Sequence, residues 1–367
     1  MSVVQVMIPV LLGVVALELV VGQARGRRVY RVADSLADLG CGAMSQVVGI
    51  AVTAVSVGTY ALTADLLAVQ RWLPVAAWPA GPLGWIAVFL LVDLGQYLTH
   101  RLSHRVALLW ACHAVHHSSE ELNYAVALRN SSFHGFFMWV FFLPLAVAGV
   151  PWRMAAVCYG LNVVYQFWLH TRLVGRLGWL ERVLNTPSHH RVHHGRDAHY
   201  LDRNFGGVLI VWDRLFGTFT PEAEEPRYGT VHPPESWNPL WANVHGFALI
   251  AEAVRRAPNW RGRLRAVFGP PEQLAGLVPA AVPPAPSPAR TVYAGVQLTF
   301  AVAATLLLVL PDRLPPLERL AWAGLVLVTL CVMGGLLDGR RWALVLEPVR
   351  LAVVVPAALL AALGPVP

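Results

Sequence analysis

The sequence contains no lysine and few charged residues of any kind. Charged side chains occupy 13% of the 367 positions, hydrophobic ones occupy 56%, and the mean hydropathy is +0.53. A chain this apolar cannot hide its hydrophobic surface by folding as a water-soluble globule. The composition therefore predicts an integral, multi-pass membrane protein.

Cysteine is also scarce. The four cysteines, Cys41, Cys112, Cys158 and Cys331, are scattered and form no CxxC pair, which argues against a disulfide framework or a zinc ribbon. All 28 basic residues are arginine, and the formal net charge is +7. Because these arginines flank apolar segments, the surplus indicates membrane orientation and anionic lipid rather than a nucleic-acid partner.

Eight apolar stretches approach the length of a bilayer span. They are 2–21, a part of 36–69, 83–99, 136–150, 154–169, 291–310, 320–337 and 342–363. The fourth and fifth are short for a span and are compatible with one re-entrant or tilted hairpin around Pro151. The predicted fold class is all-α: a polytopic membrane bundle with a cytoplasmic, histidine-rich helical cap.

The arginine distribution predicts the orientation. Four arginines follow the first span, at positions 25, 27, 28 and 31, and the positive-inside rule places that loop in the cytoplasm. Counting onward, the third span returns to the cytoplasm at His100 and the fifth returns at His170. We expect a metal site that faces the cytoplasm, with a bacterial inner membrane as the location.

Four segments are expected along the chain. Residues 1–82 form N-terminal transmembrane helices, 83–265 a histidine-rich core, 266–290 a proline-rich linker, and 291–367 C-terminal transmembrane helices. The last segment contains no histidine. We therefore expect it to be an appended membrane module that takes no part in the chemistry.

Eight histidines fall into three compact clusters with the patterns HxxxH, HxxHH and HxxHH. The members are His100 and His104; His113, His116 and His117; and His190, His193 and His194. Positions i, i+3 and i+4 share one face of an α-helix, so each cluster directs its imidazoles one way. Neutral imidazole binds iron, copper, nickel and zinc. Eight imidazoles are too many for one ion and suit two, and no catalytic residue beyond these ligands is predicted.

Polar residues also run along two of the apolar segments into the clusters. Asn162, Gln166 and His170 are spaced four apart, and Asp93 and Gln96 precede His100 at helical spacing. Polar groups inside a bilayer are costly and usually face a site. His170 is predicted as a ninth ligand. The candidates for supporting positions around the ligands are Asp93, Gln96, His134, Asn162, Gln166 and His189; ordinary interhelical hydrogen bonding is the alternative for the polar stripe.

The clusters and their surroundings resemble the fatty acid hydroxylase/sterol desaturase superfamily. Trp110 precedes the second cluster, NTPSHHRVHHG surrounds the third, and DRNFGGVLIVWDRLFGTF follows at 202–219. The resemblance covers about 83–246 and is greatest to the alkylglycerol monooxygenase branch, on the SSE after His117 and the QFWLHT at 166–171. Arg105, after the first cluster, stands where that branch is expected to have an acidic residue.

The resemblance implies a non-heme diiron centre that uses O2 to hydroxylate or desaturate a lipid C–H bond. The lipid is a sterol, a fatty acyl chain or an alkylglycerol ether lipid. The eight clustered histidines become the iron ligands, with His170 as the ninth. The chain has no flavin or dinucleotide fingerprint, so electrons must come from an external donor, either tetrahydrobiopterin or a redox protein.

The alternative function is a histidine-rich membrane protein that binds or transports metal without oxygenase activity. Transport sites use few, exchangeable ligands near the middle of the bilayer. The clusters here are predicted at one membrane face, which favours the oxygenase.

Overall fold

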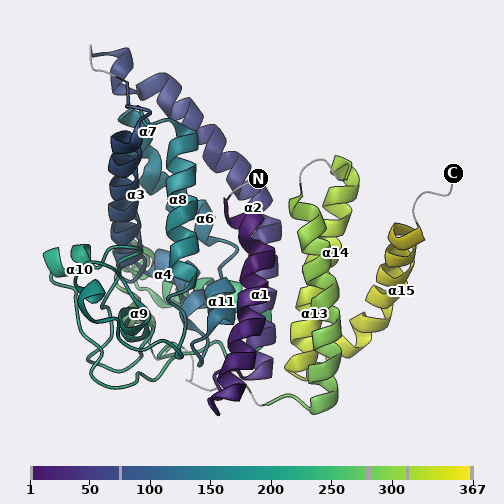
Figure 1. Cartoon of the computed structure of the whole chain (residues 1–367). Helices are drawn as coiled ribbons and strands as arrows, with labels where there is room; N and C mark the ends of the chain where they lie inside the picture. Colours follow the sequence, from purple (N-terminus) through teal and green to yellow (C-terminus); the bar gives the residue numbers. More distant parts are fainter. Residues whose placement is uncertain are drawn as a thin grey trace.

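The computed structural model describes residues 3–73, 77–275, 277, 283, 285–310 and 314–363. Every regular element in these ranges is helical, and the only extended pairings are two isolated bridges, Leu184 with Leu209 and Gly195 with Tyr228. The predicted all-α class is confirmed (Figure 1).

Three long helices begin the chain: α1 (Val3–Ala24), α2 (Val32–Leu67) and α3 (Pro82–Ser103), with the short 3₁₀ helix η1 (Val69–Arg71) after α2. Each is long and apolar enough to cross a membrane. Pro82 opens α3 at a position where its missing N–H costs no hydrogen bond. These helices confirm the first three expected spans.

The next segment differs from the expected fourth and fifth spans. It folds as α4 (Ala107–His117), α5 (Tyr124–Leu128), α6 (His134–Met138), η2 (Trp139–Phe142), α7 (Leu143–Val147) and α8 (Trp152–Phe167). Pro144 lies in the first turn of α7, and the chain turns at Gly149, whose φ is +76°. The apolar segment His134–Val147 is shorter than a span and α8 has 16 residues. The two pack together on either side of Pro151, as the hairpin alternative allowed, so the count of eight was too high for the described residues. Five helices meet the length and apolarity of a span there.

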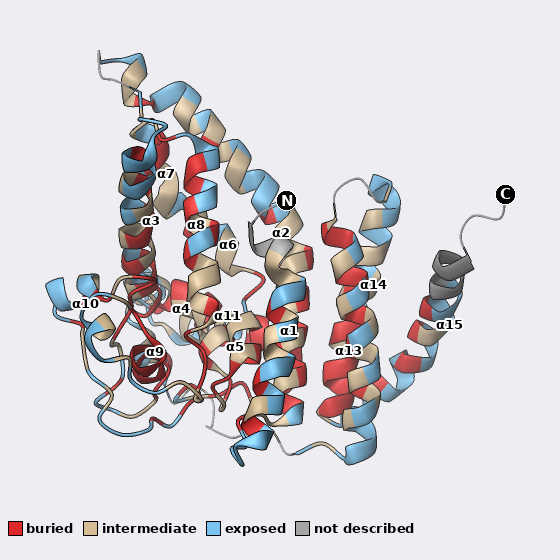
Figure 2. Cartoon of the chain, viewed as in Figure 1, coloured by how far each residue is buried: buried red, intermediate tan, exposed pale blue. Residues whose placement is uncertain are grey.

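Shorter helices and loops follow α8 and form a region at one end of the bundle. They are η3 (Gly178–Arg182), α9 (Pro187–His193), α10 (Val211–Leu215), α11 (Pro239–Arg256), α12 (Trp260–Phe268) and η4 (Pro271–Leu274). Helix α9 is buried on every side despite its polar sequence (Figure 2). A buried polar helix requires partners for its side chains, and it carries the third histidine cluster.

Helices α13 (Pro288–Val309), α14 (Pro316–Leu337) and α15 (Arg341–Leu363) end the chain. The expected spans at 291–310 and 320–337 are confirmed. The eighth, at 342–363, coincides with α15, whose side chains from residue 357 onward lie outside the described residues. A hydrophobic core joins α13 and α14 to α2 through Ala301, Leu330 and Met44.

Most of the arginines that flank the long helices lie at one end of the bundle, although Arg71, Arg153 and Arg319 lie at the other. Figure 1 shows the C-terminal ends of α1, α3 and α14 and the N-terminal ends of α2, α13 and α15 at the end occupied by α9 and α10. The histidine clusters are therefore on the side of the bundle that carries most of these arginines, as the orientation argument requires.

Candidate metal centre

Nine histidines from four segments converge at the end of the bundle. His100 is in the last turn of α3 and His104 caps it; α4 supplies the second cluster, and α9 with its C-cap supplies the third. His170 follows the end of α8. Their ligand atoms fall into two groups, each within 4.8 Å: His100, His104, His113, His117 and His193; and His116, His170, His190 and His194.

The ring nitrogens are spaced like ligands of a common ion. The Nε2 atom of His113 is 2.9 Å from that of His100 and 3.1 Å from that of His117. In the other group, the Nε2 atom of His170 is 3.1 Å from that of His116 and 2.9 Å from that of His190. With metal–nitrogen bonds of about 2.0 to 2.1 Å, neighbouring ligand nitrogens are about 3 Å apart. Both groups therefore have the spacing that a metal ion requires.

The hydrogen bonds on the opposite ring nitrogens fix the tautomers. The Nδ1 atom of His116 is 3.1 Å from the carbonyl oxygen of Arg129, and that of His170 is 3.0 Å from the carbonyl oxygen of Gln166. A carbonyl only accepts, so each Nδ1 carries the hydrogen and each neutral ring has a bare lone pair on Nε2. Two lone pairs 3.1 Å apart repel each other and cannot form a hydrogen bond. A cation between them satisfies both, so the residues present fit a metal.

Two rings of the group of five are held in the same way. The Nδ1 atoms of His100 and His193 are each 2.9 Å from a main-chain carbonyl, those of Phe205 and Arg203. Such outer contacts orient metal-binding histidines and make them better ligands.

Burial keeps the imidazoles neutral. The pKa of His117, His190, His193 and His194 lies well below the usual 6.5 because burial disfavours the charged ring and neighbouring histidines add to that effect. The same burial lowers the pKa of His116 to about 4. Neutral rings are the form that binds metal.

Asp93 holds the loop that fixes His100 rather than contacting a ligand. Its carboxylate accepts hydrogen bonds from the amides of Val208 and Leu209, at 2.8 and 3.1 Å, and from Nε1 of Trp212 at 2.8 Å. This loop follows Phe205, whose carbonyl accepts from His100.

The other predicted supporting residues occupy different places. Asn162 donates to Asp93 at 2.6 Å and accepts from the side chain of Gln166 at 2.7 Å. Gln96 and His134 line a cavity beside the histidines, and the ring of His134 is 6.0 Å from that of His113. His189 lies outside both groups, 4.0 Å from Glu181.

Sequence reasoning missed several residues that support the histidines. Asp213 accepts from the amides of Phe205 and Gly206 at 2.8 and 2.7 Å. Glu18 in α1 accepts from the hydroxyl of Thr171, next to His170, and from the amide of Tyr124 at 2.8 Å. Glu18 is the one carboxylate of the first apolar segment, and an ionisable residue inside a span is a signal that could have identified it.

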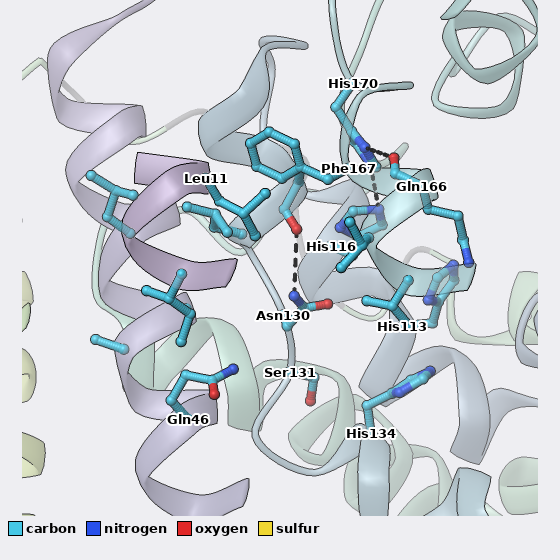
Figure 3. Close-up of a pocket in the computed structure, with 18 of the residues that line it drawn as sticks. Leu11, Gln46, His113, His116, Asn130, Ser131, His134, Gln166, Phe167 and His170 are labelled. Atoms are coloured by element: carbon cyan, nitrogen blue, oxygen red, sulfur yellow. Dashed lines mark hydrogen bonds between the residues drawn. The ribbon is translucent and has the colours of Figure 1, made fainter. Parts of the chain in front are cut away.

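Two cavities approach the histidines, and they share none of them. The first is lined by His100, His113, His116, His170 and His190, together with side chains of α1, α2, α8 and α13. Figure 3 shows His113, His116 and His170 on one side of it and Leu11 and Gln46 on the other.

The second cavity lies against the other four histidines of the two groups, His104, His117, His193 and His194. Trp110, Thr230 and Glu272 line it as well. The hydroxyl oxygen of Thr230 and Nδ1 of His232 are buried there without a hydrogen-bond partner. Unsatisfied buried polar atoms are rare in proteins, so this cavity has spare hydrogen-bonding capacity for a ligand.

Comparison with known proteins identifies similar chains. Residues 85–218 match the family model described as fatty acid hydroxylase. The chain is 35% identical over 355 residues to an alkylglycerol monooxygenase of Xenopus tropicalis, covering 91% of this chain and 77% of that protein. It is 34% identical to the alkylglycerol monooxygenase of Homo sapiens, covering 93% and 79%.

A bacterial relative is similar over a shorter stretch. An ornithine lipid hydroxylase of Rhizobium tropici is 31% identical over 151 residues, covering 39% of this chain and 44% of that protein. No solved structure matches the chain.

Proposed function

The chain belongs to the fatty acid hydroxylase family and is a lipid-modifying monooxygenase, and we propose that it is a diiron enzyme acting on the alkyl chain of an ether lipid. Two relatives that the chain covers over more than three quarters of their length are alkylglycerol monooxygenases. Alkylglycerols are therefore the first substrate class to test. The relatives do not favour the alternative, a metal-binding or transport protein.

The observation that carries the proposal is the pair of histidine groups with fixed tautomers. We assign one iron ion to the group of five and one to the group of four. Imidazole ligands suit iron, and a bound iron pair supplies the O2-dependent oxidation of an unactivated C–H bond that no side chain performs alone. The rest of the chain must therefore give the lipid substrate and the external electron donor access to this centre.

The first cavity supports the assignment of a lipid substrate. Its walls include Leu11, Val163, Phe167 and Leu306, from helices in or beside the apolar bundle. An alkyl chain placed here leaves water for an apolar environment, which is favourable in proportion to the area buried. The chain then lies beside His113, His116 and His170 with bulk water excluded.

The second cavity supports a separate route for electrons. It contacts the opposite set of histidines and contains the unpartnered atoms of Thr230 and His232. We propose that the external donor, tetrahydrobiopterin or a redox protein, delivers electrons on this side. The lipid and the donor then reach the centre from different directions.

The location is proposed from charge and helix ends. Arginines on the connections beside the histidines favour a cytoplasmic position for this end of the bundle. The alkylglycerol monooxygenase relatives are animal proteins and give no support to a bacterial inner membrane, so that expectation is not carried further. The four-segment division, at 1–82, 83–265, 266–290 and 291–367, remains a prediction.

Iron analysis and isotope labelling test the proposal together. Protein purified in detergent after iron loading is expected to hold about two iron ions per chain. With an alkylglycerol, tetrahydrobiopterin and 18O2, it should yield a lipid product that carries 18O. Iron-replete protein that incorporates no 18O with either a pterin or a ferredoxin system would refute the oxygenase. Protein that binds one ion or none would refute the diiron centre.

A further inference from the structure

Helix α13 reaches the cavity of the first histidine set although it lies outside the matched family region, 85–218. Val302, Thr305 and Leu306 of α13 line the cavity with Ile8 and Leu11 of α1. In Figure 1, α1 and α2 stand between α13 and the helices that carry the histidines. The cavity therefore extends from the histidines past α1 and α2 to α13.

The exposure pattern of α13 separates a packed side from an outward side. Ala294, Ala301 and Leu308 are buried in the core with α2 and α14. Val296 and Leu307 are 62% and 55% exposed and point outward. The three cavity residues are spaced i, i+3 and i+4. Thr305 is one turn after Ala301, and Val302 also packs against the core, so the cavity wall adjoins the packed face and is separate from the outward face of Val296 and Leu307.

The cavity face of α13 presents hydrocarbon. The hydroxyl of Thr305 donates to the carbonyl of Ala301 at 2.7 Å, so its hydrogen is already used within the helix. Val302 and Leu306 add branched aliphatic groups. An apolar wall of this kind recognises an alkyl chain by shape and length, with no polar group to bind.

We propose that α13 forms part of the lipid site, with the hydrocarbon chain of the substrate packed against Val302, Thr305 and Leu306, so that this helix sets the preferred chain length. The inference rests on the proposed function for the identity of the lipid. It gives α13 a role in substrate selection, in contrast to the expectation that the C-terminal helices form an appended module.

Two adjacent leucines supply a matched pair of variants. Leu306→Trp places a bulky ring in the cavity, whereas Leu307→Trp places the same ring on the exposed face one residue later. Each purified variant is offered an equimolar mixture of dodecyl, hexadecyl and icosyl glycerols, and bound lipid is quantified by mass spectrometry. Turnover of each lipid and iron content are measured in parallel.

Leu306→Trp should lower the retention and kcat/KM of the icosyl lipid about tenfold or more relative to the dodecyl lipid, since a filled pocket excludes the larger ligand. Leu307→Trp should keep the wild-type profile, and Leu306→Ala should shift it toward longer chains. An equal loss at every length, or the same profile in both tryptophan variants, would overturn the role of α13. Retention is measured without turnover, so the two hypotheses can be separated. If the wild-type protein retains these lipids according to their length but oxidises none of them, the proposed function is refuted and the role of α13 is not.

Discussion

Asp38 of α2 and Arg129 form a buried ion pair at 2.9 Å, and the carbonyl of the same arginine holds the His116 ring. The guanidinium also donates to the carbonyl of Val115 at 2.7 Å and to the hydroxyl of Ser118 at 2.8 Å. A carboxylate inside a membrane helix thus fixes the main chain that orients His116, one of the proposed metal ligands.

Asp38→Asn is expected to destabilise the protein and to weaken iron binding. Removing one partner of a buried ion pair leaves an uncompensated charge and costs about 3 to 5 kcal/mol. Thermal unfolding in detergent and iron per chain are the measurements. Glu252→Gln, which affects an exposed pair with Arg255, is the control and should change neither. Normal stability with full iron in Asp38→Asn would contradict the role of this pair.

Substitution of one histidine in each group should separate the two ions. His193→Ala removes a ligand of the group of five and His190→Ala a ligand of the group of four. Each variant is expected to retain about one iron and to lose turnover, because the centre needs both ions, while membrane insertion is unchanged. His199→Ala removes a half-exposed histidine outside both groups and should behave as wild type. Retained turnover in both ligand variants would exclude the third cluster from the site.

Stability of the metal-free protein should fall with acid. Burial lowers the pKa of His116, His134 and His189 to about 4. In the unfolded chain these rings take up protons near pH 6.5, whereas in the folded chain they stay neutral down to about pH 4. The stability they contribute is therefore present above pH 6.5 and is lost between about pH 6.5 and 4, by up to about 1.4 kcal/mol per ring and pH unit.

Unfolding of chelator-treated protein at about pH 7.5 and pH 5 measures this loss. The midpoint should drop at the lower pH, and His134→Gln should reduce the drop because one titrating ring is gone. A midpoint independent of pH would show that the rings are not held neutral by the fold.

Thr230→Val tests the route for electrons. The substitution keeps the shape of the side chain and removes a hydroxyl that has no partner in the second cavity. The KM for tetrahydrobiopterin should rise several-fold, because a typical hydrogen bond contributes about 1 kcal/mol, and the KM for the lipid should not change. Thr305→Val makes the same change in the first cavity. It is the matched control and should leave the KM for tetrahydrobiopterin unchanged. A rise in the lipid KM instead would place the donor elsewhere.

The spacing of the histidines in the sequence was enough to predict which residues converge. Helical periodicity puts His113, His116 and His117 on one side of a helix. The four-residue spacing of the polar side chains from Asn162 to His170 predicted that His170 would join them. The supporting contacts were not predictable, because most of them are main-chain carbonyls such as those of Phe205 and Arg203. Every residue carries a main-chain carbonyl, so composition and periodicity cannot show which carbonyl will accept a hydrogen bond from a histidine ring.

Two other expectations show what apolar length and residue type leave open. Apolar length alone suggested a span at 136–150, but the apolar helix ends at Val147 and the chain turns at Gly149, where φ is +76°, so the segment is too short to cross a bilayer. The absence of histidine from α13 suggested that it takes no part in the chemistry. Leu306 lines the first cavity, so that expectation is now tested by the Leu306 variants. Aliphatic residues that line a binding site and aliphatic residues that face the lipid tails of the bilayer are the same residue types, so the sequence does not distinguish them.

No ligand histidine belongs to both cavities, and this separation has a kinetic consequence. The imidazoles act as a partition, so a donor bound on one side cannot block a lipid entering on the other. The lipid and the donor can then bind in either order. Double-reciprocal plots of the initial rate against one of them, at several concentrations of the other, should show intersecting lines, and neither should compete with the other.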